Sequence, residues 1–130
     1  MNTIRNPEHA RYCWVDLAAR VAEIASSFYG NLFGWKTQDK DVIVGHFKRF
    51  LLGDMDVASL YQLNRRQLAD GVPSHWTPYV AVNDVEQTAS CAASLGATIL
   101  VRPFDIAGIA RVCLIRDPGG ALIGLWQQSE

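Results

Sequence analysis

Apolar and polar residues alternate along this chain with two periods, the two-residue period of strands and the longer period of helices. Residues 12–17 (YCWVDL) form an apolar run with one carboxylate inside it, which predicts a short strand. Residues 21–32 then predict an amphipathic helix, and Gly34 follows as a helix-ending glycine. The apolar positions of this helix are Val21, Ile24, Ala25, Phe28 and Leu32.

Three further strands are expected in the first half of the chain, at 35–38, 44–52 and 57–63. Gly53-Asp54 separates the last two and has the composition of a hairpin turn. Residues 64–74 (NRRQLADGVPS) are polar and include a glycine and a proline, so we expect a linker there.

The same order of elements then starts again. Residues 78–82 predict a strand, and Asn83 or Asp84 can cap a helix that Gly96 ends. That helix has its apolar residues at Val85, Ala89, Ala92 and Leu95, and the three strands expected after it span 97–101, 110–116 and 121–127. Asp117-Pro118-Gly119-Gly120 is typical of a tight turn and carries no chemistry. The duplicated order predicts two modules that pack together to cover their sheets.

Composition and charge narrow the class of protein. The chain has 130 residues, of which 49% are hydrophobic, enough for the core of one domain. Its 12 Lys and Arg against 13 Asp and Glu give a net charge of -1 without a basic tract, which disfavours nucleic acid or a membrane as the partner. The absence of a signal-like or membrane-spanning apolar run predicts a soluble, cytoplasmic protein.

The three cysteines suggest no chemistry of their own. Cys13, Cys91 and Cys113 are an odd number without CxxC spacing, and each lies in an apolar segment. We therefore expect buried thiols rather than a disulfide or a nucleophile.

Four stretches together carry a resemblance to a known family. They are WVDLAA, FYGNLFGW, HWTPYVAVNDV and ARVCLIRDPGGALIGLWQ, and they extend over nearly the whole chain. The chain thereby resembles the vicinal oxygen chelate superfamily, also called the glyoxalase/bleomycin-resistance/extradiol-dioxygenase fold. The resemblance implies an α+β fold in which two tandem βαβββ modules form a half-open, mostly antiparallel barrel with the helices outside. One domain, 1–130, would comprise modules at about 10–63 and 76–128 and a linker at about 64–75.

In metal-dependent members of this family, the first and last strand of each module supply His, Glu or Gln ligands. The corresponding positions in this chain are Trp14, Tyr61, Thr77 and Gly124. None is a good ligand for a divalent metal, so we expect no metal and no cofactor. His75 would share the face of Thr77 if its strand begins early, but it has no partner ligands. His9 and His46 are expected at the surface.

Strand alternation identifies the side chains that would line the concave side. If Trp14 faces that side, Asp16 and Ala18 do so as well, while Cys13, Val15 and Leu17 face the helices. From the second module, the inward residues would be Thr77, Tyr79, Ala81, Leu122, Gly124 and Trp126. With Tyr61, and with Arg111 if it enters, these residues would form an aromatic-walled cavity in which Gly124 leaves room for a ligand. The alternative is that the rings fill a closed core.

Asp16 is the candidate catalytic residue, because a carboxylate in an apolar strand needs a partner and has a raised pKa. The alternative is a structural carboxylate held by a backbone amide or by Arg111.

The residues thus favour metal-independent binding of a small, partly aromatic ligand, of the bleomycin-resistance or sequestration type. The alternative function is a metal-independent isomerase, cyclase or lyase that uses Asp16 as an acid or base. Metal-dependent glyoxalase or dioxygenase chemistry is less favoured. Members of this family often dimerise, so a homodimer is expected.

Overall fold

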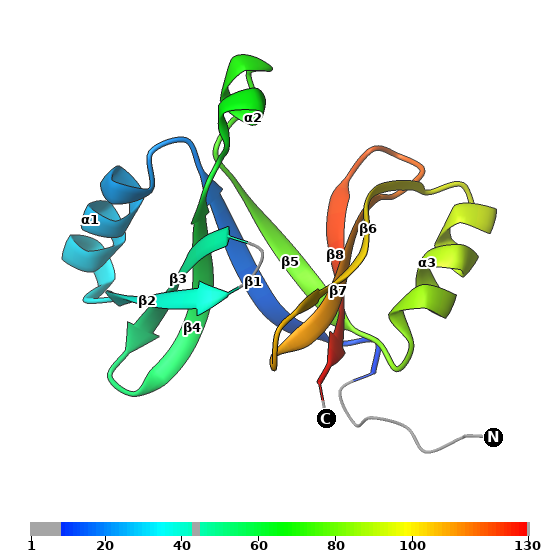
Figure 1. The fold of residues 1–130 in the computed structure, drawn as a ribbon, viewed down its shortest axis with the longest axis horizontal. Helices are drawn as coiled ribbons and strands as arrows, with labels where there is room; N and C mark the ends of the chain where they lie inside the picture. Colours follow the sequence, from blue (N-terminus) through cyan, green and yellow to red (C-terminus); the bar gives the residue numbers. More distant parts are fainter. Residues whose placement is uncertain (1–8, 43–44, 130) are drawn as a thin grey trace. The chain divides into compact units, whose positions relative to one another are not determined.

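The computed structural model describes residues 9–42 and 45–129, and the side chains of these residues except those of 39–47. Within these residues it contains eight strands and three helices (Figure 1). In chain order they are β1 (Tyr12–Ala19), α1 (Ala22–Phe33), β2 (Lys36–Val42), β3 (Gly45–Leu52), β4 (Met55–Gln62), α2 (Arg65–Ala69), β5 (His75–Ala81), α3 (Val85–Ser94), β6 (Thr98–Ile106), β7 (Ala110–Arg116) and β8 (Leu122–Gln128).

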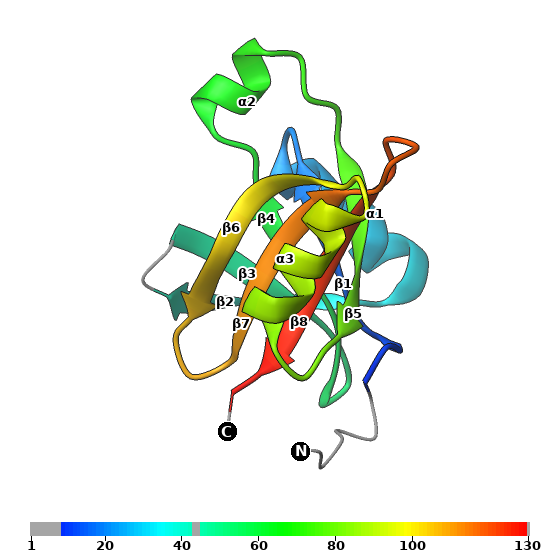
Figure 2. The same cartoon turned by 90° about the vertical axis from the view of Figure 1, so that its right-hand side faces the viewer.

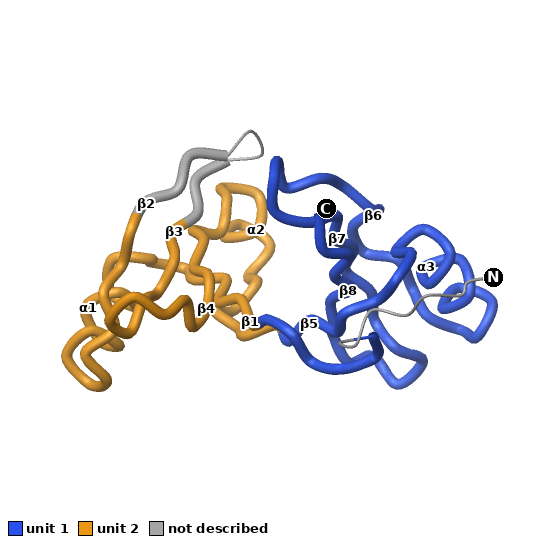
Figure 3. The backbone as a smooth tube through the Cα atoms, turned by 90° about the horizontal axis from the view of Figure 1, so that it is seen from below, with its two compact units in different colours: residues 1–14, 78–130 blue, residues 15–77 orange. Residues whose placement is uncertain are grey.

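The chain divides into two compact units (Figure 3). One comprises residues 15–77, with the strand order β2-β3-β4-β1, and the other comprises residues 1–14 and 78–130, with the order β5-β8-β7-β6. In each unit the first and last strands of the repeat pair in parallel, β1 with β4 and β5 with β8. The other strand pairs within each unit are antiparallel. The α+β class and the mostly antiparallel pairing predicted from the sequence are therefore confirmed.

Helix α1 covers one face of its sheet, but only part of its predicted apolar stripe packs against that sheet. Ala25 and Tyr29 pack against a cluster of buried side chains, Leu17, Ala19, Phe50, Ala58 and Leu60. Of the positions in the expected stripe, Ile24, Phe28 and Leu32 are 67%, 56% and 56% exposed. The small side chain of Ala25 and the aromatic ring of Tyr29 cover the sheet. Ile24, Phe28 and Leu32 therefore remain largely in solvent.

In the unit that contains residues 78–130, helix α3 covers β6, β7 and β8 (Figure 2). Of the two predicted caps, Asp84 is the one used, and its carboxylate accepts a hydrogen bond from the backbone N–H of Gln87. Val85 and Ala89 are buried against Cys113 and Leu125, as the sequence pattern predicts. Leu95 is 73% exposed, because the helix ends there and the last position of its stripe lies beyond the sheet.

The turns agree with their sequences, while several strands are longer than predicted. Gly53 has φ of 61° in the β3–β4 turn, and the Asp117 carboxylate accepts hydrogen bonds from the N–H groups of Gly119 and Ala121. The weakly patterned β2 extends to Val42, in a seven-residue register with β3 at the end of the strand order. An outer strand tolerates polar residues on both faces, which explains its weak pattern. Strand β5 begins at His75 rather than at residue 78.

The predictions of which His and Cys side chains are buried and which are exposed are only partly correct. Cys113 is buried and Cys13 is half-buried, but Cys91 is exposed on α3, so the prediction of a third buried thiol was wrong. His9 is half-buried, and its Nδ1 accepts a hydrogen bond from the N–H of Asn83. The side chain of His46 lies outside the described residues. Among the helices of the described ranges, none is both long and apolar enough to cross a bilayer.

The expected linker contains a short helix that is tied to the end of β1. Asn64 caps α2 and forms a reciprocal capping box with Gln67. The Arg20 guanidinium donates hydrogen bonds to the carbonyl oxygens of Val72 and Leu68, at 2.7 and 3.3 Å, and the Arg20 N–H donates to Ser74. One arginine therefore holds both ends of the turn that follows α2.

We expect Arg20→Ala to loosen this segment. Two hydrogen bonds from a charged donor are lost, so trypsin should cleave after Arg65 and Arg66 roughly three to ten times faster than in the wild type. Limited proteolysis followed by mass spectrometry measures this rate. Arg11→Ala, at the exposed residue just before β1, is the control. Equal cleavage rates for the two variants would contradict the proposed role of Arg20.

Candidate functional site

The inner face of the first unit, meaning the face of its sheet turned away from α1, carries a buried carboxylate. The register of β1 and β4 pairs Asp16 with Ser59 and Ala18 with Tyr61. Their neighbours Leu17 and Leu60 pack toward α1, so alternation places Asp16, Ser59 and Tyr61 on the inner face. The orientation of Asp16 expected from the sequence therefore agrees with the packing around it.

Asp16 is 8% exposed, and Ser59 donates a hydrogen bond from its hydroxyl to Oδ1 of this carboxylate at 2.6 Å. Burial raises the pKa of Asp16 from 3.8 to about 6, although the Ser59 hydrogen bond and the charge of His75 act in the opposite direction. The partner is a serine hydroxyl rather than Arg111, the structural partner considered from the sequence. Asp16 can therefore exchange a proton near neutral pH.

Tyr61 lies close enough to Asp16 to interact with it electrostatically. Burial raises the pKa of Tyr61, the negative charge of Asp16 raises it further, and a hydrogen bond with Gln67 lowers it. The phenol therefore remains protonated and can donate a hydrogen bond. Thr77, the other expected inner residue of this unit, is buried. Together these residues offer a titratable carboxyl and hydroxyl groups.

Arg49 is an inner-face residue that the sequence did not indicate. Its strand position pairs with Ser59, and its Nη1 contacts both carboxylate oxygens of Asp56 at 2.9 and 3.0 Å. Its Nη2 donates to Gln38, and its buried Nε has no hydrogen-bond partner among the described residues. Only the strand register reveals this position, because residues 44–52 contain no motif around Arg49.

The inner face of the second unit, meaning the face of its sheet turned away from α3, is aromatic. Trp126 lies between two other rings, with centroid distances of 5.9 Å to Trp14 and 5.8 Å to Tyr79. A Cβ atom on Gly124 would collide with the ring of Tyr79, so this glycine makes room for the tyrosine. The sequence interpretation, that Gly124 leaves room for a ligand, is corrected here because Tyr79 already occupies that space. Cys13 also packs beside these rings rather than against a helix.

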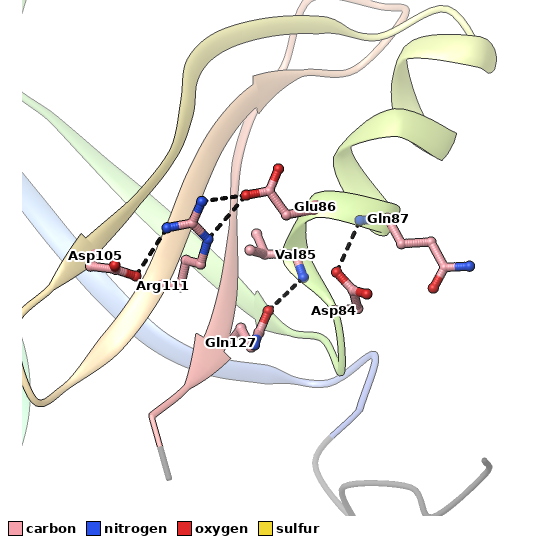
Figure 4. A network of polar contacts seen from close by, with 7 residues as sticks. All are labelled: Asp84, Val85, Glu86, Gln87, Asp105, Arg111 and Gln127. Atoms are coloured by element: carbon pink, nitrogen blue, oxygen red, sulfur yellow. Dashed lines mark hydrogen bonds and ion pairs between the residues drawn. The ribbon is translucent and has the colours of Figure 1, made fainter. Parts of the chain in front are cut away.

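Arg111 faces α3 and not the aromatic rings. Its neighbours Val112 and Leu114 pack with Tyr79, so Arg111 and Cys113 point to the opposite side of β7. The guanidinium hydrogen-bonds Glu86 of α3 and, at 3.0 Å, Asp105 of β6 (Figure 4). Arg111 therefore does not enter a cavity beside the aromatic rings, as the sequence analysis considered. Two carboxylates hold this arginine on the helix side.

The side chains at the family's metal-ligand positions do not fit a divalent cation. An indole, a phenol, a hydroxyl and a glycine stand at these positions, which offer neither imidazole nor carboxylate. His75 does share the alternation of Thr77, because β5 begins at His75, and its Nδ1 donates to the carbonyl oxygen of Pro73. In the described part of the chain, no three His, Cys, Asp or Glu residues are grouped as metal ligands would be.

Comparison with known proteins places the chain in a family. Residues 11–125 match the sequence profile of the Glyoxalase/Bleomycin resistance protein/Dioxygenase superfamily. The chain is 33% identical over 127 residues to CFP32 of Mycobacterium bovis, provisionally named a glyoxylase, and 27% identical over 129 residues to the anthracycline biosynthesis protein DauV of Streptomyces sp. strain C5. The chain belongs to this superfamily, as the sequence resemblance implied.

These two relatives are longer than the chain. The matches cover 90% and 88% of this chain but only 45% of CFP32 and 46% of DauV. The chain therefore spans slightly less than half the length of the curated relatives it matches.

Solved structures show the same fold. Methylmalonyl-CoA epimerase from Mycobacterium tuberculosis superposes with a TM-score of 0.65 at 14% identity, covering 98% of this chain and 94% of the epimerase. The Mn(II)-bound glyoxalase from Novosphingobium aromaticivorans gives 0.62 at 12% identity, covering 92% of this chain and 39% of that protein. At such identities the likeness concerns the fold alone.

The raised pKa of Asp16 predicts a specific pH dependence of stability. Between pH 3.8 and about 6 the folded protein binds more protons than the unfolded chain, so this carboxyl lowers the free energy of unfolding as pH rises. The shift corresponds to about 3 kcal/mol. Asp16→Asn lacks this titration, so its stability relative to wild type should increase by about that amount from pH 4 to pH 7.

Urea unfolding followed by tryptophan fluorescence at several pH values measures this difference. Asp54→Asn, in the exposed β3–β4 turn, should track the wild type across the range. Parallel curves for Asp16→Asn and wild type would show that Asp16 is not desolvated as described.

Gly124→Ala should destabilise the protein by about 1–3 kcal/mol, because the added Cβ collides with the Tyr79 ring. Replacing Tyr79 by alanine removes the obstacle, so Gly124→Ala should cost much less in a Tyr79→Ala background. A double-mutant cycle from denaturant unfolding tests this coupling. Additive effects of the two changes would argue against a collision between these side chains.

Proposed function

We propose that the protein binds a small, partly aromatic molecule without a metal ion. The residues proposed to contact it are Trp14, Asp16, Tyr61, Thr77, Tyr79 and Trp126. The observation that carries the proposal is the chemistry of these positions, where aromatic rings and one buried carboxyl stand and metal ligands do not. Gly124 contributes by allowing Tyr79 to lie close to the backbone, and Arg111 is left out because it faces α3.

Each group supports a distinct part of such recognition. Aromatic side chains stack on flat ring systems, while a single carboxyl orients a ligand hydroxyl or amine. The relative DauV is named for anthracycline biosynthesis, and anthracyclines are flat fused-ring molecules, which agrees with a ligand of this class.

Binding of a defined probe tests this proposal. With 1,8-dihydroxyanthraquinone as the probe, we expect saturable quenching of tryptophan fluorescence that is unchanged by EDTA. Trp126→Leu should weaken binding roughly tenfold, since one stacked ring is lost. The matched control is Trp76→Leu, because the Trp76 indole packs against Tyr29 of α1. Loss of binding on chelation, or equal effects of the two tryptophan substitutions, would refute metal-independent binding by the inner-face rings.

Native mass spectrometry of protein purified without chelators complements this titration. We expect an organic molecule to co-purify with the wild type and to be depleted in Trp126→Leu. A bound metal in stoichiometric amount would contradict the proposal.

A second candidate function is acid–base catalysis by Asp16, in a metal-independent isomerase, cyclase or lyase. The observation favouring it is the combination of a carboxyl whose pKa is raised to about 6 with a neighbouring protonated phenol, Tyr61. If Asp16 is a general base, turnover of the co-purified molecule should rise with pH through about 6, and Asp16→Asn should slow it by roughly a hundredfold or more. Unchanged turnover in Asp16→Asn would rule out Asp16 as the acid or base, whereas no turnover by the wild type would leave the protein with a binding role only.

A further inference from the structure

A groove lies between β1 and α1, on the helix side of the first unit. Its volume is about 410 Å³. Small-molecule sites in proteins have volumes of roughly 300–1,000 Å³, so the groove is large enough for a small ligand. All of its lining residues belong to the unit of residues 15–77. The groove is therefore formed within one compact unit, on the side of β1 opposite to Asp16.

Most of the groove lining is apolar. Leu17 and Ala19 of β1 line its deeper part, because both are buried in the cluster beneath α1. Ile24 and Phe28 of α1 line its rim and are more than half exposed. The methyl group of Ala19 leaves space between strand and helix that a larger side chain would fill. An apolar rim of this kind is typical of a surface that a ligand covers.

Arg20 and Ser74 form the polar part of the lining. The backbone N–H of Arg20 donates to Ser74 Oγ at 2.9 Å, and the guanidinium donates to two carbonyl oxygens of the segment after α2. These bonds hold Arg20 in place and leave further N–H donors of its exposed guanidinium for an anion. Within the described residues, no carboxylate forms an ion pair with Arg20, and none lines the groove. The groove therefore combines apolar walls with one uncompensated positive charge.

We propose that this groove binds a small carboxylate with an apolar chain, such as a fatty acid of medium length. The apolar side chains of β1 and α1 remove the chain from water, and Arg20 donates charge-assisted hydrogen bonds to the carboxylate. A ligand with a positive head group would bring two like charges together, so the groove selects by charge. This site lies on the other face of the sheet from Asp16 and Tyr61 and does not depend on the function proposed above.

Titration of the full chain with octanoate, followed by NMR of the backbone amides, tests this proposal. We expect saturable shifts at Ala19, Ile24 and Phe28, with a dissociation constant on the order of 0.1–1 mM for so small a ligand. The amides of Tyr79 and Trp126, in the other unit, should not shift. Hexanoate is shorter by two methylene groups and should bind roughly tenfold more weakly. Octylammonium, which has the opposite charge, should not bind.

A pair of substitutions at one exposed position tests the selection by charge. Ile24→Glu brings a negative charge to the rim and should weaken octanoate binding roughly tenfold or more. Ile24→Lys keeps an apolar stem at the same position and should bind within about threefold of the wild type. Arg20→Gln removes the charge that pairs with the carboxylate and should also weaken binding roughly tenfold. Leu95→Glu is the matched control, because it adds the same charge at an exposed residue at the end of α3.

Circular dichroism establishes that each variant is folded. The absence of saturable shifts in the wild type up to about 10 mM octanoate would overturn the proposal. Equal binding of octanoate and octylammonium would do the same, as would octanoate binding that neither Ile24→Glu nor Arg20→Gln weakens. Binding of 1,8-dihydroxyanthraquinone is measured separately by tryptophan quenching and should not be displaced by octanoate. Either proposal can therefore fail without the other.

Discussion

The parallel pairing of the first and last strands of each repeat is the constraint on which the candidate site depends. When β4 returns beside β1, Asp16 is brought opposite Ser59, and Leu17 opposite Leu60. Because side chains alternate along strands, this register sends the leucines toward α1 and the carboxyl with its serine to the other face. A shift by one residue would bury Asp16 against the helix and expose the leucines. The hydrophobic core therefore holds the buried carboxyl of Asp16 in place.

The same topology supports different chemistry in the two units. In one, β1 and β4 bring together a desolvated carboxyl, a serine hydroxyl and a phenol. In the other, β5 and β8 bring Tyr79 over Gly124 and beside Trp126. Neither set resembles a metal centre, although the family contains metal-dependent members. The fold supplies inner-face positions, and the side chains at those positions decide what can be bound.

The outer face of α1 shows why an apolar pattern does not by itself identify a core. Ile24 and Phe28 have the spacing of buried residues, yet the sheet is covered by Ala25 and Tyr29. The spacing shows that the helix is amphipathic, and only the packing shows which of its apolar residues contact the sheet.

The sequence by itself determined the family, the α+β class, the order of the elements and the facing of Asp16, because these follow from local periodicity, turn residues and specific motifs. It did not determine that Ser59 is the partner of Asp16, that Tyr79 fills the space over Gly124, or that Arg111 pairs with Glu86. It also gave no sign of Arg49 on the inner face. Each of these contacts joins residues from different elements, so it depends on strand register and side-chain packing. Only the tertiary structure decides these, since the periodicity of a strand specifies a face but not the neighbour that occupies it.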